Sequence, residues 1–192
     1  TRFISLQPVA GLSMEHDGLA VEDGGSFSFA VSVMDGFRFD LSNLEAVTDK
    51  GRKVEHSVGA DGIHTFRLDD VREDVSVMLT GYVQYFRVTA VLDGVTTVGF
   101  AEWVAQGSVL DLPLSPADGG SVSATVYMAG EDVTGSSFSS GRVLIQSVQG
   151  DVTIVASSEP SSADGSSPGL WVIVAVVLAA AVALALVLRR RC

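Results

Sequence analysis

The sequence of 192 residues contains a single cysteine, Cys192, and it is the last residue. An internal disulfide framework is therefore excluded. Exported receptors of the vertebrate type usually carry disulfides, so their absence agrees with a bacterial protein. Asparagine occurs only at Asn43, outside any acceptor sequence for N-glycosylation, and this modification is excluded as well.

Basic residues are also scarce. The chain has 12 lysines and arginines against 23 acidic residues, and three of the arginines stand at the extreme C-terminus. Residues 1–168 therefore hold 9 basic and 23 acidic groups, a net charge of −14. A surface this acidic repels phosphate backbones, so we expect no nucleic acid among the partners.

Residues 169–188 lack charged side chains altogether. Twenty residues at a rise of about 1.5 Å form a helix of about 30 Å, the thickness of the hydrocarbon core of a bilayer. The segment therefore predicts a transmembrane helix, with the lipid bilayer as a partner. Membrane-interface residues are expected at both of its ends: Trp171 at the outer side and Arg189, Arg190 and Arg191 at the inner side.

These arginines also set the expected orientation. The positive-inside rule predicts a single-pass protein of the cell membrane, with residues 189–192 as a cytoplasmic tail and the large N-terminal part extracytoplasmic. A tail anchor with that part in the cytosol is the less favoured alternative, because it carries three arginines across the membrane. Since no apolar export segment is present near Thr1, we expect a processed chain or the C-terminal part of a longer one. The serine-rich residues 157–168 predict a flexible stalk.

Upstream of the stalk, apolar and polar residues alternate with a period of two. The run from Ser26 to Val33 is the clearest example, with Phe27, Phe29 and Val31 on one face and serines on the other. This alternation is typical of strands with one buried face. Turn dipeptides separate the runs: Asp17-Gly18, Asp35-Gly36, Asp61-Gly62, Asp93-Gly94 and Asp118-Gly119. The sequence therefore predicts an all-β fold.

Two stretches of sequence recur. Residues 24–31 resemble residues 119–126, 95 positions later, and residues 66–77 resemble residues 143–154, 77 positions later. These matches predict two related β-sandwich modules, 1–81 and 82–156, with about 18 residues missing from the middle of the second. A single larger sandwich is the alternative.

The first module resembles the immunoglobulin-like repeats of Gram-positive bacterial surface proteins. The resemblance rests on Asp35-Gly36-Phe37 and on the run from Asp70 to Val75, which match a turn and a closing strand of those repeats. It implies two immunoglobulin-like β-sandwich modules, in a stalk or adhesin at the cell surface, and it supplies no catalytic residue. The sorting motif that often ends that family is absent here.

The sequence gives no support for catalysis. Residues 165–169 match the nucleophile elbow Gly-x-Ser-x-Gly, but the motif requires a strand before it and here follows a serine-rich stretch. His16, His56 and His64 have no zinc-binding spacing, and His64 is expected to be a half-buried strand residue. We therefore expect a protein that is not an enzyme, with no catalytic or cofactor-binding residue.

One metal site is considered. Asp69, Asp70, Glu73 and Asp74 gather four carboxylates in one turn, and calcium prefers oxygen ligands. Solvated acidic turns are the favoured interpretation, because no known calcium motif is present, and a calcium site is the less favoured alternative.

The sequence therefore favours a non-catalytic, single-pass protein of the cell surface that presents β-sandwich modules for adhesion or as a stalk. Its partner would be an extracellular protein or glycan. The alternative is the spacer and membrane anchor of a larger surface enzyme with a catalytic domain upstream of Thr1.

Overall fold

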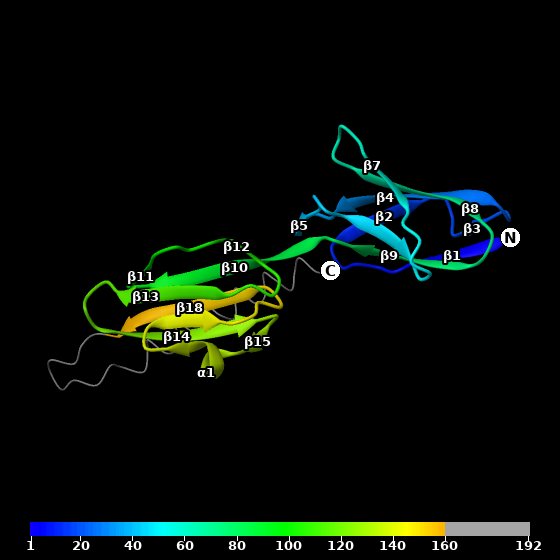
Figure 1. Ribbon diagram of the computed structural model, residues 1–192. Helices are drawn as coiled ribbons and strands as arrows, with labels where there is room; N and C mark the ends of the chain where they lie inside the picture. Colours follow the sequence, from blue (N-terminus) through cyan, green and yellow to red (C-terminus); the bar gives the residue numbers. More distant parts are fainter. Residues whose placement is uncertain (160–192) are drawn as a thin grey trace. The chain divides into compact units, whose positions relative to one another are not determined.

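The computed structural model describes residues 1–159, which form short β-strands joined by tight turns (Figure 1). The described residues contain one helix, the single turn α1 (Thr134–Ser137). The expected all-β fold is confirmed. The predicted transmembrane helix 169–188, its flanking Trp171, Arg189, Arg190 and Arg191, and stalk residues 160–168 lie outside the described residues. Within residues 1–159, no helix is long and apolar enough to span a bilayer.

The chain divides into two compact units, Thr1–Tyr85 and Phe86–Cys192, of which the second is described as far as Glu159. The division falls within one strand, β10 (Val83–Asp93), four residues beyond the boundary expected after residue 81. Each unit has its own cluster of buried apolar side chains. Two separate cores do not fit the alternative of one large sandwich.

Two four-stranded sheets enclose the core of the first unit, in the orders β3-β1-β9-β6 and β2-β4-β8-β7. A ninth strand, β5, pairs with the first residues of β10. The strands are β1 (Arg2–Leu6), β2 (Leu12–His16), β3 (Ala20–Val21), β4 (Gly25–Val33), β5 (Arg38–Asp40), β6 (Glu45–Thr48), β7 (Glu55–Val58), β8 (His64–Val71) and β9 (Val75–Thr80).

The second unit has the sheet orders β12-β10-β18-β14-β15 and β11-β13-β17-β16. Besides β10, its strands are β11 (Val95–Thr97), β12 (Trp103–Ala105), β13 (Leu110–Pro116), β14 (Ser121–Met128), β15 (Glu131–Asp132), β16 (Phe138–Ser139), β17 (Arg142–Ile145) and β18 (Val152–Glu159).

The two units repeat the same topology. The sheet order β3-β1-β9-β6 of the first unit corresponds to β12-β10-β18-β14 in the second. The order β2-β4-β8-β7 corresponds in the same way to β11-β13-β17-β16. In both units the first strand runs parallel to the last, as β1 with β9 and β10 with β18. The other strand pairs with described registers are antiparallel.

The repeat holds at the level of single core residues. Buried Phe27 and Phe29 of β4 lie opposite Leu68 and Phe66 of β8. In the second unit, buried Leu110 and Leu112 of β13 lie opposite Ile145 and Val143 of β17. Strands β4 and β13 therefore correspond with an offset of 83 positions (27 to 110), and strands β8 and β17 with an offset of 77 (66 to 143).

These registers correct one of the two sequence matches. Residues 66–77 and 143–154 do correspond, since both form the last two strands of a unit. The match of residues 24–31 with 119–126 is wrong, because it pairs β4 with β14, which occupies the place of β6. Both segments are alternating strands after a Gly-Gly turn, and this local pattern does not distinguish the two sheets. The second unit lacks about 6 residues (83 against 77), not 18.

Several strands differ from expectation. No strand was expected at β2, β5, β15 or β16, which are short and bury few side chains. The predicted stalk begins too early, because Ser157, Ser158 and Glu159 belong to β18 and pair with β14. Their polar side chains fit a strand whose backbone is held by its neighbour.

Candidate functional site

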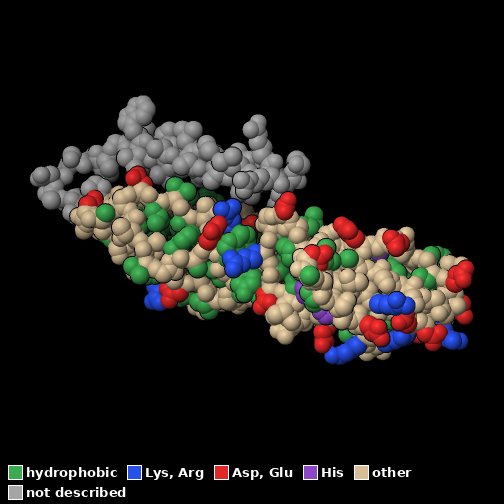
Figure 2. Space-filling view, turned by 90° about the horizontal axis from the view of Figure 1, so that it is seen from above, with side chains coloured by type: hydrophobic (Ala, Val, Ile, Leu, Met, Phe, Trp, Pro, Cys, Tyr) green, Lys and Arg blue, Asp and Glu red, His purple; other side chains and the backbone are tan. Residues whose placement is uncertain are grey.

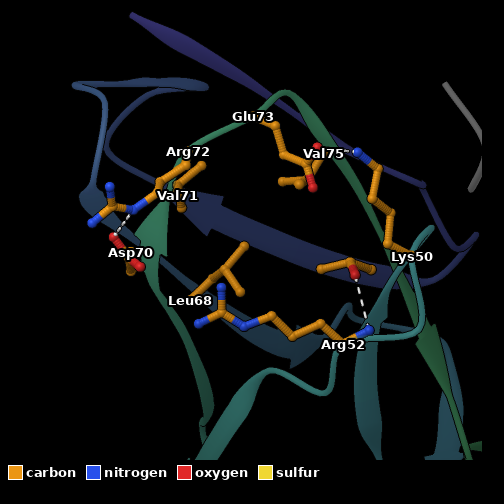
Figure 3. Close-up of a pocket in the computed structure, with 9 residues that line it drawn as sticks. Lys50, Arg52, Leu68, Asp70, Val71, Arg72, Glu73 and Val75 are labelled. Atoms are coloured by element: carbon orange, nitrogen blue, oxygen red, sulfur yellow. Dashed lines mark hydrogen bonds and ion pairs between the residues drawn. The ribbon is translucent and has the colours of Figure 1, made fainter.

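The candidate site is a pocket of about 190 Å³ in the first unit, beside the turn from β8 to β9 (Figure 3). Leu68, Val71 and Val75 supply its apolar lining. Thr48 and five charged side chains form the rest of the wall; the charged residues are Lys50, Arg52, Asp70, Arg72 and Glu73. The pocket therefore combines an apolar surface with three cations and two carboxylates.

A tight turn after β6 positions two of the cations. The Gly51 N–H donates to the Thr48 carbonyl at 2.9 Å, and the Arg52 N–H donates to the Thr48 hydroxyl at 3.1 Å. Gly51 has a φ of +77°, a conformation that glycine adopts without steric cost. This turn places Lys50 and Arg52 on the pocket wall, where Arg52 Nη2 also donates to the Asp69 carbonyl at 2.7 Å.

A backbone irregularity positions Asp70. Its φ is +52°, in the left-handed region that few residues other than glycine adopt, and the β4–β8 register shifts between Gly25 and Phe27. The adjacent Val71 carbonyl accepts from the Gly24 N–H at 2.8 Å, which holds the bulge in place. Strained positions of this kind cluster at functional sites. This conformation therefore sets where Asp70 stands on the pocket wall.

Each cation in the pocket already has a partner. Arg72 Nε lies 2.7 Å from Asp70 Oδ1, and the Lys50 amine contacts the Glu73 carboxylate (Figure 3). The hydrogen bond to Glu73 raises the pKa of Lys50, so this amine stays charged at neutral pH. Both pairs are exposed to solvent, where ion pairs are weak. A bound anion can therefore replace a carboxylate at little cost.

The four residues considered as an alternative calcium site lie at this turn but contact separate partners. Asp69 accepts from Ser26 Oγ and from Arg67 Nε at 2.8 Å, and these bonds lower its pKa. Asp70 and Glu73 pair with Arg72 and Lys50, and Asp74 accepts from the Phe3 N–H. Across residues 1–159, no three carboxylate, histidine or cysteine side chains are grouped to hold a metal ion. Calcium binding stays the less favoured alternative, which a melting scan with and without chelator tests.

Asp74 has a structural role that recurs. Its Oδ1 accepts from the Phe3 N–H of β1 at 2.9 Å, and Asp151 Oδ1 accepts from the Arg87 N–H of β10 at the same distance. Each aspartate stands just before the last strand of its unit and ties it to the first strand. In the sequence, the Asp-Val dipeptide repeated at residues 74–75 and 151–152 indicates this side-chain to backbone hydrogen bond.

The second unit shows which pocket residues the fold requires. The apolar positions keep their character: Leu68, Val71 and Val75 correspond to Ile145, Val148 and Val152, all buried. The charged positions do not: Lys50, Asp70, Arg72 and Glu73 correspond to Met128, Ser147, Gln149 and Gly150. The same sheet topology thus forms without these charges, and within residues 1–159 they occur at these positions in the first unit alone.

Sequence reasoning did not single out Lys50, Arg52 and Arg72 as site residues. They come from two separate segments, and only the fold brings them together. A usable signal was their rarity, since residues 1–168 hold only 9 basic groups. On the face shown in Figure 2, basic side chains lie among acidic ones and form no continuous basic surface.

No known protein family, curated protein or solved structure matches the chain.

Proposed function

We propose that this is a single-pass protein of the cell surface that presents two tandem immunoglobulin-like β-sandwich units, and that its first unit binds the acidic sugar of an extracellular glycan. The function is adhesion, not catalysis. The observation that carries the proposal is the charged pocket of the first unit, whose charges the second unit replaces with neutral residues although it has the same topology.

The fold supports a role at the surface. Each unit has two sheets around one core, an architecture found in many cell-surface domains. In the sequence, the uncharged residues 169–188, followed by Arg189, Arg190 and Arg191, favour a membrane anchor with both units outside.

The chemistry of the pocket favours a ring that carries a carboxylate. The apolar face of a sugar packs against Leu68, Val71 and Val75. Its carboxylate then meets the cations of Lys50, Arg52 and Arg72, and the planar guanidinium of arginine matches a carboxylate with two parallel hydrogen bonds. A volume of about 190 Å³ leaves room for one ring and not for a longer chain.

Ligand binding is tested with the full chain in detergent. A glycan that ends in glucuronic acid should bind, and its glucose-terminated analogue should bind about tenfold more weakly or not at all. The double variant Lys50→Met/Arg72→Gln carries the side chains that stand at these positions in the second unit, and it should lose about tenfold in affinity. The matched control is Arg87→Gln, which removes an exposed arginine paired with Glu102 in the second unit. Equal binding of both glycans, or an unchanged double variant, contradicts the proposal.

Orientation is tested by protease digestion of intact bacterial cells that express the full chain. The two units should be digested without lysis, while a cytosolic marker remains intact. Digestion only after lysis would place the units inside the cell and overturn the surface role.

A further inference from the structure

Two histidines meet on neighbouring strands of the first unit. Strand β7 lies at the edge of its sheet and pairs with β8 so that His56 is opposite Phe66, while His64 is opposite Val58. His56 Nε2 and His64 Nδ1 are 2.9 Å apart and share a hydrogen bond whose donor depends on the tautomer, so a metal ion would take the place of the shared proton. His64 and Phe66 are two positions apart on β8, so both histidines lie on the same face of the sheet.

The aromatic residue beneath holds the pair in place. The His56 ring stacks on Phe66, with centroids 4.5 Å apart and planes 8° apart, and Phe66 in turn stacks on Phe29. Phe66 is fully buried, so the ring under His56 has a fixed position. Burial and the neighbouring His56 lower the pKa of His64, which keeps its ring neutral and able to act as a ligand at neutral pH.

The fold does not require these histidines. In the second unit, Phe138 stands opposite Val143 as His56 stands opposite Phe66, so phenylalanine takes the place of His56. Gly141, 77 positions after His64, takes the place of His64. His56 is exposed and His64 is half-buried, so ions in solution reach the pair.

The distance between the two nitrogens fits one class of metal ion. An ion about 2.0 Å from each nitrogen subtends an angle of about 90° between ligands 2.9 Å apart. This is the angle between neighbouring ligands in the tetragonal geometry of Cu²⁺ and Ni²⁺, and it is smaller than the tetrahedral angle that Zn²⁺ prefers. Imidazole is a suitable ligand for both ions.

We propose that His56 and His64 form a two-histidine site for a divalent ion of tetragonal preference, Cu²⁺ before Ni²⁺, at the edge of the first unit. Water or an extracellular ligand completes the coordination. The site lies on β7 and β8 and uses none of the cations of the charged pocket in the first unit. It is therefore independent of the proposed glycan binding.

The test uses the full chain without a polyhistidine tag and with Cys192→Ser throughout, because a thiol also binds copper. Titration with Cu²⁺ should give one ion per chain and an electron paramagnetic resonance spectrum with coupling to two imidazole nitrogens. His56→Phe keeps an aromatic ring over Phe66 and should lose one nitrogen and at least about tenfold in affinity. His64→Gln should do the same.

The matched control is His16→Gln, which changes the remaining histidine, on β2 of the same sheet. It should leave stoichiometry and spectrum unchanged. The proposal is overturned if the starting protein binds no Cu²⁺, if His56→Phe retains two-nitrogen coupling, or if His16→Gln loses binding equally. Should His64→Gln fail to fold, His56→Phe decides alone.

Discussion

At the scale of single residues, the equivalent aspartates Asp74 and Asp151 show that a short sequence motif marks the same contact in both units. Each accepts a hydrogen bond of 2.9 Å from a backbone N–H of the first strand in its unit. The bond joins the residue before the last strand to the first strand of the same unit. The dipeptides Asp74-Val75 and Asp151-Val152 therefore mark the point where the last strand of each unit is joined to the first.

We expect Asp74→Ala to lower the free energy of unfolding of the first unit by about 1 kcal/mol, the value of a typical hydrogen bond. Asp151→Ala should have the same effect on the second unit. Hydrogen exchange followed by mass spectrometry measures the two units separately. Asp74→Asn is the control, because its amide oxygen still accepts the bond and it should retain most of the stability. Equal losses for Asn and Ala would show that the charge, not the acceptor, matters.

His64 should make the first unit sensitive to acid. Burial, and then the nearby His56, lower its pKa below the ordinary value of 6.5, so the unfolded chain binds a proton more readily than the folded one. The associated stability is present above pH 6.5 and is lost as the pH falls below 6.5 through the folded pKa.

The measurement is urea unfolding at a series of pH values around 6.5, with hydrogen exchange to identify the first unit. His64→Gln should flatten the pH dependence in this range, and His16→Gln should not. A slope that persists in His64→Gln would assign the acid sensitivity to another group.

At the scale of strands and turns, the sequence predicts the fold class and the closing strands well. Residues 66–77 and 143–154 match because they combine an apolar pair, a valine and an Asp-Val dipeptide in fixed order. The alternation in β4 and β14 carries no such order, so the sequence could not tell that these strands belong to different sheets. The edge strand β2 was missed because it is short, and only Leu12 and Met14 alternate with polar residues there.

The candidate site could be predicted only in part. The acidic turn at residues 69–74 does form part of the pocket wall, but its four carboxylates suggested calcium as an alternative and drew no attention to Arg72 between them. Lys50 and Arg52 come from a turn about 20 residues earlier, and the pairing of β6 with β9 brings them beside it. Contacts between distant segments leave no local pattern.

Strand β8 should be the most sensitive element of the first unit. Phe66 is fully buried and stacks on both Phe29 and His56. We expect Phe66→Ala to cost about 3–5 kcal/mol, through lost burial and the cavity left behind. The control is Arg67→Ala, the next residue on the same strand, whose exposed side chain pairs with Asp69 and should matter little. Denaturant unfolding compares the two, and similar losses would contradict the assigned core.

At the scale of the whole molecule, residues 1–159 form two units of the same topology that differ in the charges of one pocket. The buried positions of the two units agree in register, whereas the pocket charges occur in the first unit alone. Both units therefore share the two-sheet architecture, and the difference between Lys50, Arg72 and Glu73 and their neutral counterparts restricts the charged pocket to the first unit.

Because the buried side chains form two separate clusters, a core substitution should act on its own unit. We expect Val143→Ala, at a fully buried position of β17, to increase hydrogen exchange in the second unit and to leave exchange in β4 and β8 unchanged. Loss of protection in both units would show that they unfold together.

The parallel pairing of first and last strands has a mechanical consequence. When the ends of such a unit are pulled apart, the two strands must slide past each other, so their hydrogen bonds bear the load together and do not open one by one. The ladder joins three residue pairs in the first unit, from Ile4 to Leu6, and six in the second, from Val88 to Asp93. Under tension the first unit should therefore rupture before the second, which would lengthen a stretched chain while its remaining unit stays intact.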